Sequence, residues 1–237
     1  TEIMKAMLNF IFDYSESGRW KKNFAAHDVG TYPLANGQTY QEDMPVEETG
    51  NMLIMTTAIA IADGNADYAA KHWETLTIWS NYLAEEGLDP ENQLCTEDFA
   101  GHLAHNANLS AKAIMAIAGY GRLAKMLNKP EEAKKYTEMA KKMAIEWERK
   151  ANDGDHYRLA FDRPDTWSQK YNFVWDKTLG MNVLPTEIMK KEVAFYLKNQ
   201  NKYGLPLDNR FTWGKIDDTV WSATMADSES DFQELIR

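Results

Sequence analysis

The sequence predicts an all-α fold in which helical hairpins form a double ring, similar to an (α/α) toroid. Segments that are apolar around most of their circumference alternate with segments that carry one apolar stripe. A helix that is apolar on every side needs neighbours all round it, whereas a striped helix needs them on one side only. A ring of buried helices inside a ring of amphipathic helices meets both demands. An open α-solenoid is the alternative, and its inner helices would line an exposed concave surface.

The first helical segments follow from local signals. Residues 3–13 show helical periodicity, and a polar loop covers residues 15–43. Pro45 suits the first turn of a helix, and we expect that helix over residues 47–62, where the run MLIMTTAIAIA is apolar on nearly every side. Residues 65–85 carry a single stripe at helical spacing and predict an outer helix.

The same pair recurs along the chain. Residues 105–127 are again apolar all round, and residues 130–149 are again striped after Pro130 and two glutamates. Further helices are expected in two pairs, over residues 170–183 with 186–199 and over residues 217–226 with 228–237. Two short stretches, 155–161 and 204–213, could form hairpin arms.

The domain organisation follows from the absence of any composition break. We expect one domain over residues 1–237, made of about four hairpins and one preceding helix. Because the chain opens directly in a helical pattern without a methionine, we expect it to be a fragment, with the rest of an incomplete ring elsewhere in a longer polypeptide.

Composition limits the function classes. The net charge is −10, which argues against nucleic acid or an anionic membrane surface as a partner and favours a small-molecule substrate. Cys95 is the only cysteine, so no internal disulfide can form. No apolar run reaches 18 residues, so no transmembrane span is expected.

Ionisable and polar side chains gather in the loops that lead into the apolar helices. In a ring, those helix N-termini point toward one end, so the side chains would converge on one funnel. In chain order the candidates are His27, Asp28, Glu47, Glu48, Asp98, His102, His105, Asn106, Trp167, Lys170, Asp217 and Asp218.

Carboxylates with histidines and a lysine indicate hydrolysis by an activated water. Neither a metal nor a cofactor is expected, because no recognised spacing for either is present. Glu47 and Glu48 lie about 100° apart on a helix, so at least one can face the funnel. His102 and His105 are three residues apart, and substrate hydrogen bonding, a structural role and metal binding all remain open for them. Asp217 and Asp218 could instead cap their helix.

Four segments carry a family resemblance: HDVGTYP at 27–33, MPVEETGNMLI at 44–54, DFAGHLAHNANLSAKAI at 98–114 and WSQKYNFVWDKTLG at 167–180. They resemble the glutaminase A family, large secreted proteins of fungi and bacteria with a six-hairpin (α/α) toroid. The resemblance implies hydrolysis of L-glutamine to glutamate and ammonia, and a periplasmic or secreted location. It also implies that the remaining domains of the same polypeptide are partners. An S-D-W-type segment is expected near the end, where this chain instead has WGKIDDTVWSATMAD at 213–227.

The roles expected within the funnel follow from position and chemistry. Glu47 or Glu48 would activate the water, and Asp98 would bind the substrate amino group or act as the partner carboxylate. The other groups would bind the substrate: His102, His105 and Lys170 at its carbonyl or α-carboxylate, Trp167 as a wall, and His27, Asp28, Asn106, Asp217 and Asp218. A glycoside hydrolase acting in the same funnel and a non-catalytic binding module are the alternatives.

Overall fold

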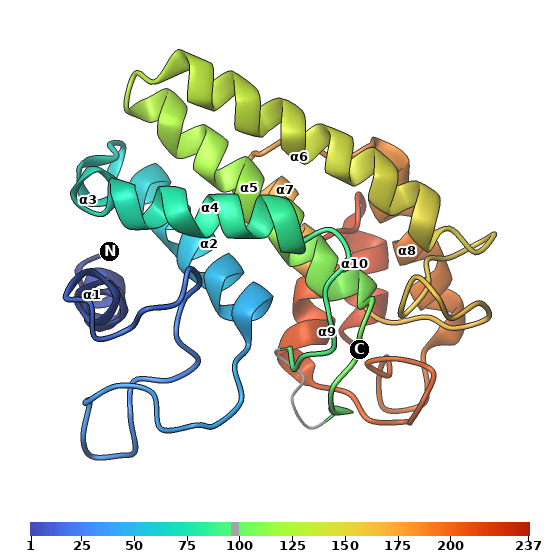
Figure 1. Ribbon diagram of the computed structural model, residues 1–237. Coiled ribbons are helices and arrows are strands. Elements are labelled where there is room, and N and C mark those ends of the chain that lie inside the picture. Colours follow the sequence, from blue (N-terminus) through green and yellow to red (C-terminus); the bar gives the residue numbers. More distant parts are fainter. Residues whose placement is uncertain (96–99) are drawn as a thin grey trace.

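The computed structural model describes residues 1–95 and 100–237, and over those ranges it is all-helical, with isolated β-bridges in place of strands (Figure 1). The all-α prediction is therefore confirmed. In chain order the elements are α1 (Glu2–Glu16), α2 (Pro45–Asp63), α3 (Asp67–Lys71), α4 (Trp73–Glu86), α5 (Ala107–Met126), α6 (Pro130–Ala151), the 3₁₀ turn η2 (Tyr171–Phe173), α7 (Val174–Thr178), α8 (Thr186–Asn199), α9 (Ile216–Ala223) and α10 (Glu229–Leu235).

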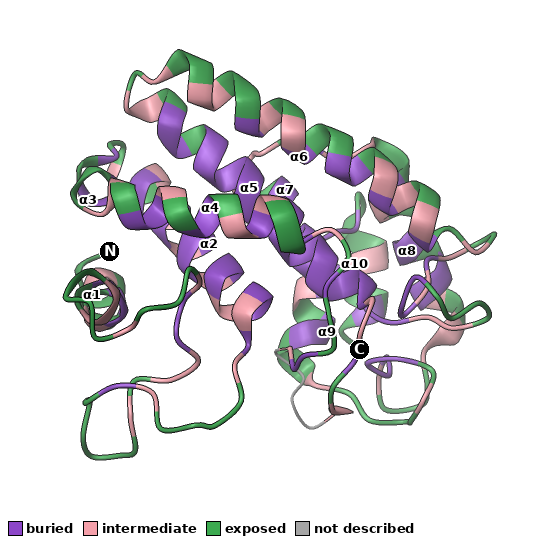
Figure 2. Ribbon diagram, viewed as in Figure 1, coloured by how far each residue is buried: buried purple, intermediate pink, exposed green. Residues whose placement is uncertain are grey.

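Helices α2 and α5 form the centre of the molecule. They pack side by side and begin at the same end, and α4 and α6 run back along the outside (Figure 1). Nearly all of α5 is buried, whereas α6 buries one stripe and exposes the opposite face (Figure 2). The indole Nε1 of Trp147, on the buried stripe of α6, donates to the carbonyl oxygen of Ala107 at 2.8 Å. The predicted alternation of buried and striped helices is present in these two hairpins.

Two glycines allow α2 and α5 to approach each other closely. A Cβ atom added at Gly50 of α2 would lie 2.6 Å from Cγ of Lys112, and one added at Gly119 of α5 would lie 2.6 Å from Oγ1 of Thr57. A methyl group at either position would require the facing side chain to shift. Both glycines therefore leave room for a side chain of the partner helix.

The predicted outer helix over residues 65–85 is interrupted at His72, which separates α3 from α4. The ring of His72 stacks on Phe12 of α1 with a centroid distance of 3.9 Å. Its Nδ1 lies 2.8 Å from Oε1 of Glu16. These contacts with α1 hold His72 outside helical geometry, although the apolar periodicity continues through it.

The third hairpin is shorter than predicted. Residues 170–183 form only η2 and α7, because the chain turns at Gly180 and Asn182, which have φ values of 60° and 55°. Oδ1 of Asp176 closes this turn by accepting from the amide nitrogen of Val183 at 2.9 Å. Helix α8 has the predicted bounds, and Ser228 caps α10 by accepting from the amide nitrogen of Asp231 at 3.0 Å.

The two expected hairpin arms do not form strands. Isolated bridges join Asn152 to Tyr157 and Ser168 to Asp208, and a further bridge joins Asn106 to Ala160. Because these bridges involve the residues just before α5 and η2, they hold the long loops against the starts of the inner segments.

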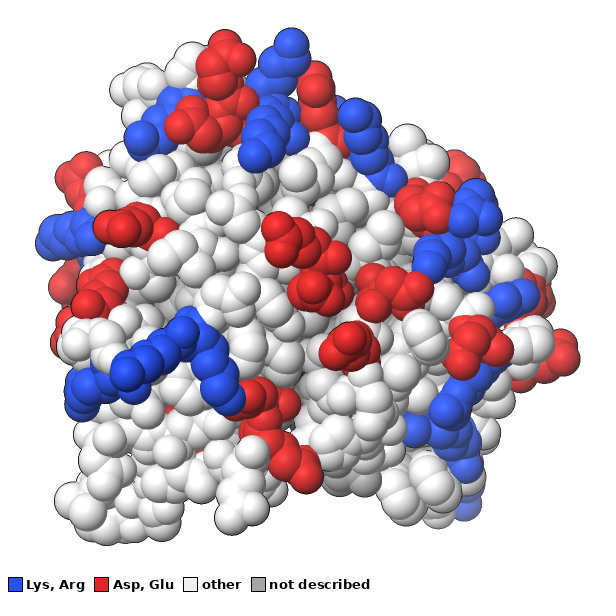
Figure 3. Space-filling view, in the orientation of Figure 1, with Lys and Arg blue, Asp and Glu red and all other residues white. Residues whose placement is uncertain are grey.

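Charged side chains are scattered over the face shown in Figure 3, much of which is uncharged, with acidic groups near its middle and both signs toward its edges. In the parts of the chain that the structure describes, no helix combines the length and apolarity needed to cross a bilayer.

Candidate functional site

The starts of the inner segments are bonded to one another in chain order. Lys112 in α5 forms an ion pair with Glu47 in the first turn of α2. Asn172 of η2 donates twice to Asn108 in the first turn of α5. These contacts place the starts of α2, α5 and η2 along one end of the molecule, as the ring arrangement requires.

The two adjacent glutamates of α2 face different surroundings. Glu47 is 1% exposed and points toward α5, whereas Glu48 is half-buried and points toward α1. Asn51, one turn later, donates from Nδ2 to Oε1 of Glu47 and to Oε2 of Glu48, both at 3.3 Å. Nζ of Lys112 donates to Oδ1 of Asn51 at 2.8 Å. Glu47 and Glu48 therefore lie at one end of a continuous polar network, and Lys112 of α5 lies at the other end.

The surroundings of Glu48 disfavour its charged form. Burial is the largest cause and the negative charge of Glu47 the next, and together they raise the pKa of Glu48 to about 7. The hydrogen bond from Asn51 and the positive charge of Lys112 act in the opposite direction. A carboxyl group with this pKa exchanges its proton near neutral pH, which is the property that general acid–base catalysis requires.

Glu48 opens into a cavity of about 300 Å³ between α1, α2 and residues 26–29. Glu48, His27 and Asp28 are the ionisable residues that line the cavity, and methionines of α1 and α2 form much of its apolar wall. Oδ1 of Asp28 accepts from the amide nitrogens of Gly30 and Thr39 at 2.9 and 3.0 Å. Backbone hydrogen bonds of this kind, opposed by burial, lower the pKa of Asp28 and hold the loop in place.

A second, smaller cavity of about 20 Å³ lies where the loops before α5, η2 and α9 meet. Asn106 lines it and also caps α5, since its Oδ1 accepts from the amide nitrogens of Asn108 and Leu109 at 3.0 and 3.1 Å. The guanidinium group of Arg210 bonds both carboxylate oxygens of Asp208 on the opposite wall, with Nη2 at 2.7 Å from Oδ2.

The two histidines of the second loop do not share a helix face. His105 precedes α5 and has a φ of 59°. Its Nδ1 lies 2.7 Å from Oδ1 of Asp89, while Nε2 of His102 lies 3.0 Å from Oε2 of Glu42. Both rings thus contact carboxylates of different loops. Asp98 lies outside the described residues. Within residues 1–95 and 100–237, no three His, Cys, Asp or Glu side chains gather as a metal ion would require.

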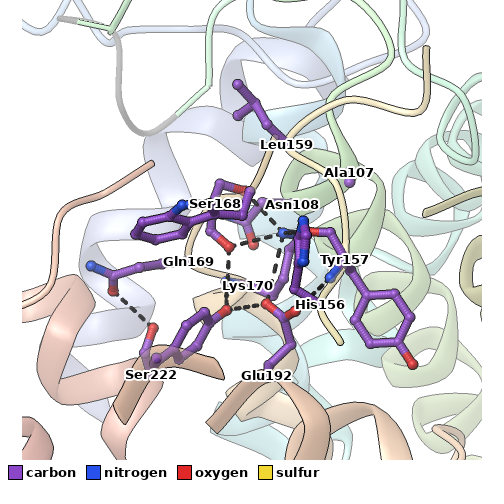
Figure 4. A network of polar contacts seen from close by, with 12 residues as sticks. Ala107, Asn108, His156, Tyr157, Leu159, Ser168, Gln169, Lys170, Glu192 and Ser222 are labelled. Atoms are coloured by element: carbon purple, nitrogen blue, oxygen red, sulfur yellow. Dashed lines mark hydrogen bonds and ion pairs between the residues drawn. The ribbon is translucent and has the colours of Figure 1, made fainter. Parts of the chain in front are cut away.

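Lys170 lies in the interior and not at an opening. Its ammonium group donates to the carbonyl oxygens of Tyr157 at 3.1 Å and Ser168 at 2.9 Å, and it lies 3.7 Å from Oε2 of Glu192 (Figure 4). Burial lowers the pKa of Lys170. Tyr196 also donates to Glu192, so the network joins the segment before η2 to α8. In this placement Lys170 joins the segments around Tyr157 and Ser168 to Glu192 of α8.

Three other predicted residues lie apart from the Glu48 cavity. Trp167 packs its ring edge-on against Phe195, with the centroids 5.5 Å apart. Asp217 is exposed, 3.9 Å from Nζ of Lys215. Asp218 is completely buried in the first turn of α9. Of the predicted site residues, the structure brings together Glu47, Glu48, His27 and Asp28.

Comparison with known proteins decides the family. The family model described as the glutaminase A six helical-hairpin domain matches residues 1–237. The chain belongs to this family. The glutaminase A of Aspergillus oryzae is 35% identical over 236 residues, which cover 97% of this chain and 34% of that protein. A protein of Arthroderma benhamiae named "probable glutaminase" is 25% identical over 299 residues, covering 89% of this chain and 35% of its own length. This chain thus spans about a third of the length of these two relatives.

Sequence reasoning missed two parts of this glutaminase A six helical-hairpin domain. Lys112 is a charged residue inside an otherwise apolar run, and that break in the pattern was a usable signal for a buried partner. Asp208 and Arg210 lie in a segment that resembles a hairpin arm, and nothing local indicates that they line a cavity. Both features depend on contacts between distant segments.

Proposed function

We propose that this domain contributes a site for hydrolysis of the side-chain amide of L-glutamine, with Glu48 as the general base. The observation that carries this proposal is the half-buried carboxyl of Glu48, which has a pKa of about 7 and opens into a cavity beside His27 and Asp28. The names of the two relatives, a glutaminase A and a "probable glutaminase", support the substrate.

In this reaction Glu48 takes a proton from water as the water oxygen attacks the amide carbon. The tetrahedral intermediate then breaks its carbon–nitrogen bond, and Glu48 returns the proton to the leaving nitrogen, which departs as ammonia. Glu47 contacts Lys112 instead of lining the cavity, and the proposal gives it no part in proton transfer. His27 lines the same cavity, and in this proposal it donates a hydrogen bond to the developing oxyanion.

The test is ammonia release from L-glutamine by the full-length protein that carries this domain. Glu48→Gln should lower kcat by roughly 100-fold or more, because general-base catalysis typically contributes that much. Glu85→Gln, at an exposed position of α4, is the matched control and should keep wild-type activity. Activity of Glu48→Gln within twofold of wild type would remove this residue from the mechanism.

A glycoside hydrolase is the second candidate, and one observation favours it. The rings of Phe211 and Trp213 stack with centroids 4.2 Å apart, and each residue is about half exposed. They follow Asp208, which lines the smaller cavity, and exposed aromatic rings commonly form platforms for apolar ring faces. A screen of oligosaccharides for bond cleavage, repeated with Trp213→Ala, separates this reaction from amide hydrolysis.

The extracytoplasmic location implied by the family resemblance is likewise a proposal. Fractionation of cells that express the full-length protein tests it, since the proposal requires the protein in the periplasm or the medium.

A further inference from the structure

A buried polar path leads from α5 to the carboxyl of Glu48. Lys112 is 4% exposed and contacts both Glu47 and Asn51, and Asn51 in turn contacts Glu48. We propose that Lys112 and Asn51 are positioning residues that fix the Glu48 carboxyl for proton transfer. The inference rests on the role of Glu48 in the proposed function.

Lys112 helps to fix the orientation of the Asn51 amide. An ammonium group can only donate, so its contact at 2.8 Å requires the amide oxygen of Asn51 to point toward α5. The NH₂ group of Asn51 must then point toward α2's first turn, where it donates to Glu47 and Glu48 at 3.3 Å each. In the opposite orientation the amide oxygen would face two carboxylates, which is repulsive. Lys112 and the two carboxylates therefore favour the same orientation of the Asn51 amide, and Lys112 is the member of this set that contacts the amide oxygen.

The path is built into the packing of the two central helices. The aliphatic stem of Lys112 crosses α2 at Gly50, the one residue type that leaves it room there. The ammonium group thereby reaches Glu47 in a buried position, where it offsets a charge that would otherwise be costly. The missing side chain at Gly50 thus leaves the space through which Lys112 reaches Glu47.

The charged and titratable groups around Glu48 come from three elements. Glu47 belongs to α2, Lys112 to α5, and His27 and Asp28 to the loop before α2, whereas the residues of α1 that line the cavity are apolar. Lys112 is the cation that acts to lower the pKa of Glu48. Its removal should make the pair of glutamates take up its first proton at a higher pH.

The test compares Lys112→Met with Lys125→Met, an exposed lysine on the same helix, in the full-length protein. Carbodiimide with glycine ethyl ester modifies protonated carboxyl groups, and peptide mapping by tandem mass spectrometry reads the modification at Glu48 across pH. In Lys112→Met the midpoint should move up by roughly half a pH unit or more, and kcat should fall about tenfold with KM changed less than about threefold. Lys112→Arg, which keeps the charge, should restore the midpoint, and Lys125→Met should match wild type.

Asn51→Leu is the second variant, used if Lys112→Met does not fold. It keeps the ion pair of Glu47 and Lys112 and removes only the hydrogen bonds of the Asn51 amide. It should shift the Glu48 midpoint in the same direction and lower kcat. A folded Lys112→Met or Asn51→Leu protein with wild-type midpoint and kcat would overturn the positioning role. A wild-type protein that releases no ammonia would contradict the proposed function instead, while the midpoint shift, measured without turnover, would still decide whether Lys112 controls Glu48.

Discussion

Asn172 bonds Asn108 twice, and these two bonds fasten the third hairpin to the start of the central helix α5. The amide nitrogen of Asn172 donates to Oδ1 of Asn108 at 3.3 Å, and its Nδ2 donates to the carbonyl oxygen of Asn108 at 2.9 Å. Both residues are buried, so loss of either bond would leave a buried polar group with fewer partners.

Asn172→Ala should therefore lower the free energy of unfolding by about 1–3 kcal/mol, because a buried carbonyl oxygen loses its donor. Asn92→Ala, at an exposed position, is the control and should change the free energy by less than about 0.5 kcal/mol. Urea unfolding followed by circular dichroism measures both variants. If Asn172→Ala were as stable as Asn92→Ala, the bonds between Asn172 and Asn108 would not contribute to stability.

Lys170→Met should destabilise the fold more strongly. The substitution leaves the carboxyl of Glu192, which is 1% exposed, without its ammonium neighbour. Removal of one member of a buried ion pair typically costs about 3–5 kcal/mol. Lys170→Met combined with Glu192→Gln should recover much of the loss, because no buried charge remains. Urea midpoints of the single and double variants measure this, with exposed Lys190→Met of α8 as the control; a single variant as stable as that control would contradict the role of the network.

Variants of Asn106 separate helix capping from the predicted role in substrate binding. Asn106→Ala should lower stability by about 1–2 kcal/mol, because the side chain accepts from two amide nitrogens of the first turn of α5. Asn106→Ser keeps a capping oxygen and should restore most of that stability. If Asn106 also binds glutamine, Asn106→Ser should raise KM. An unchanged KM in this stable variant would leave capping as its only role.

Glu48 should make stability depend on pH. Its folded-state pKa of about 7 lies above the usual value of about 4.3 for an unfolded chain, so the folded state holds its proton more tightly. The stabilisation is complete below pH ~4 and is lost as the pH rises through about 7.

Glu48→Gln should accordingly be more stable than wild type at pH 8, by about 1–2 kcal/mol once the partial exposure of Glu48 is taken into account. The difference should shrink as the pH falls toward 4. Denaturant unfolding at several pH values measures it, with Glu85→Gln as the control. A difference that is independent of pH would show that Glu48 is an ordinary carboxyl group.

Helix positions were predictable where the signals are local. Pro45 and Pro130 start α2 and α6 as expected, and α10 lies within the predicted segment 228–237. The break at His72 was not predictable, since its cause is a ring stack with Phe12, which is sixty residues away in the chain. Periodicity reports only which face a helix buries, and it is silent about contacts that bend the backbone.

The two glutamates in the first turn of α2 were predictable from the sequence, but the contacts that surround them were not. Glu47 and Glu48 are adjacent in sequence, so their proximity needed no fold. Asn51 follows them by a single helical turn, but its amide oxygen also contacts Lys112, which belongs to a different hairpin. Lys170 shows the opposite error, because a charged side chain in a loop was expected at an opening and is in fact completely buried.

The stack of His72 on Phe12 bears on the Glu48 cavity, although neither ring lines it. Helix α1 provides one wall of the Glu48 cavity through Met4, Met7 and Leu8, and α1 is pressed onto the body of the molecule where Phe12 lies between His72 and Trp79. The outer layer thus helps to hold one wall of the cavity in place. We expect substitutions that loosen His72 to change the shape of the cavity without changing a residue that lines it.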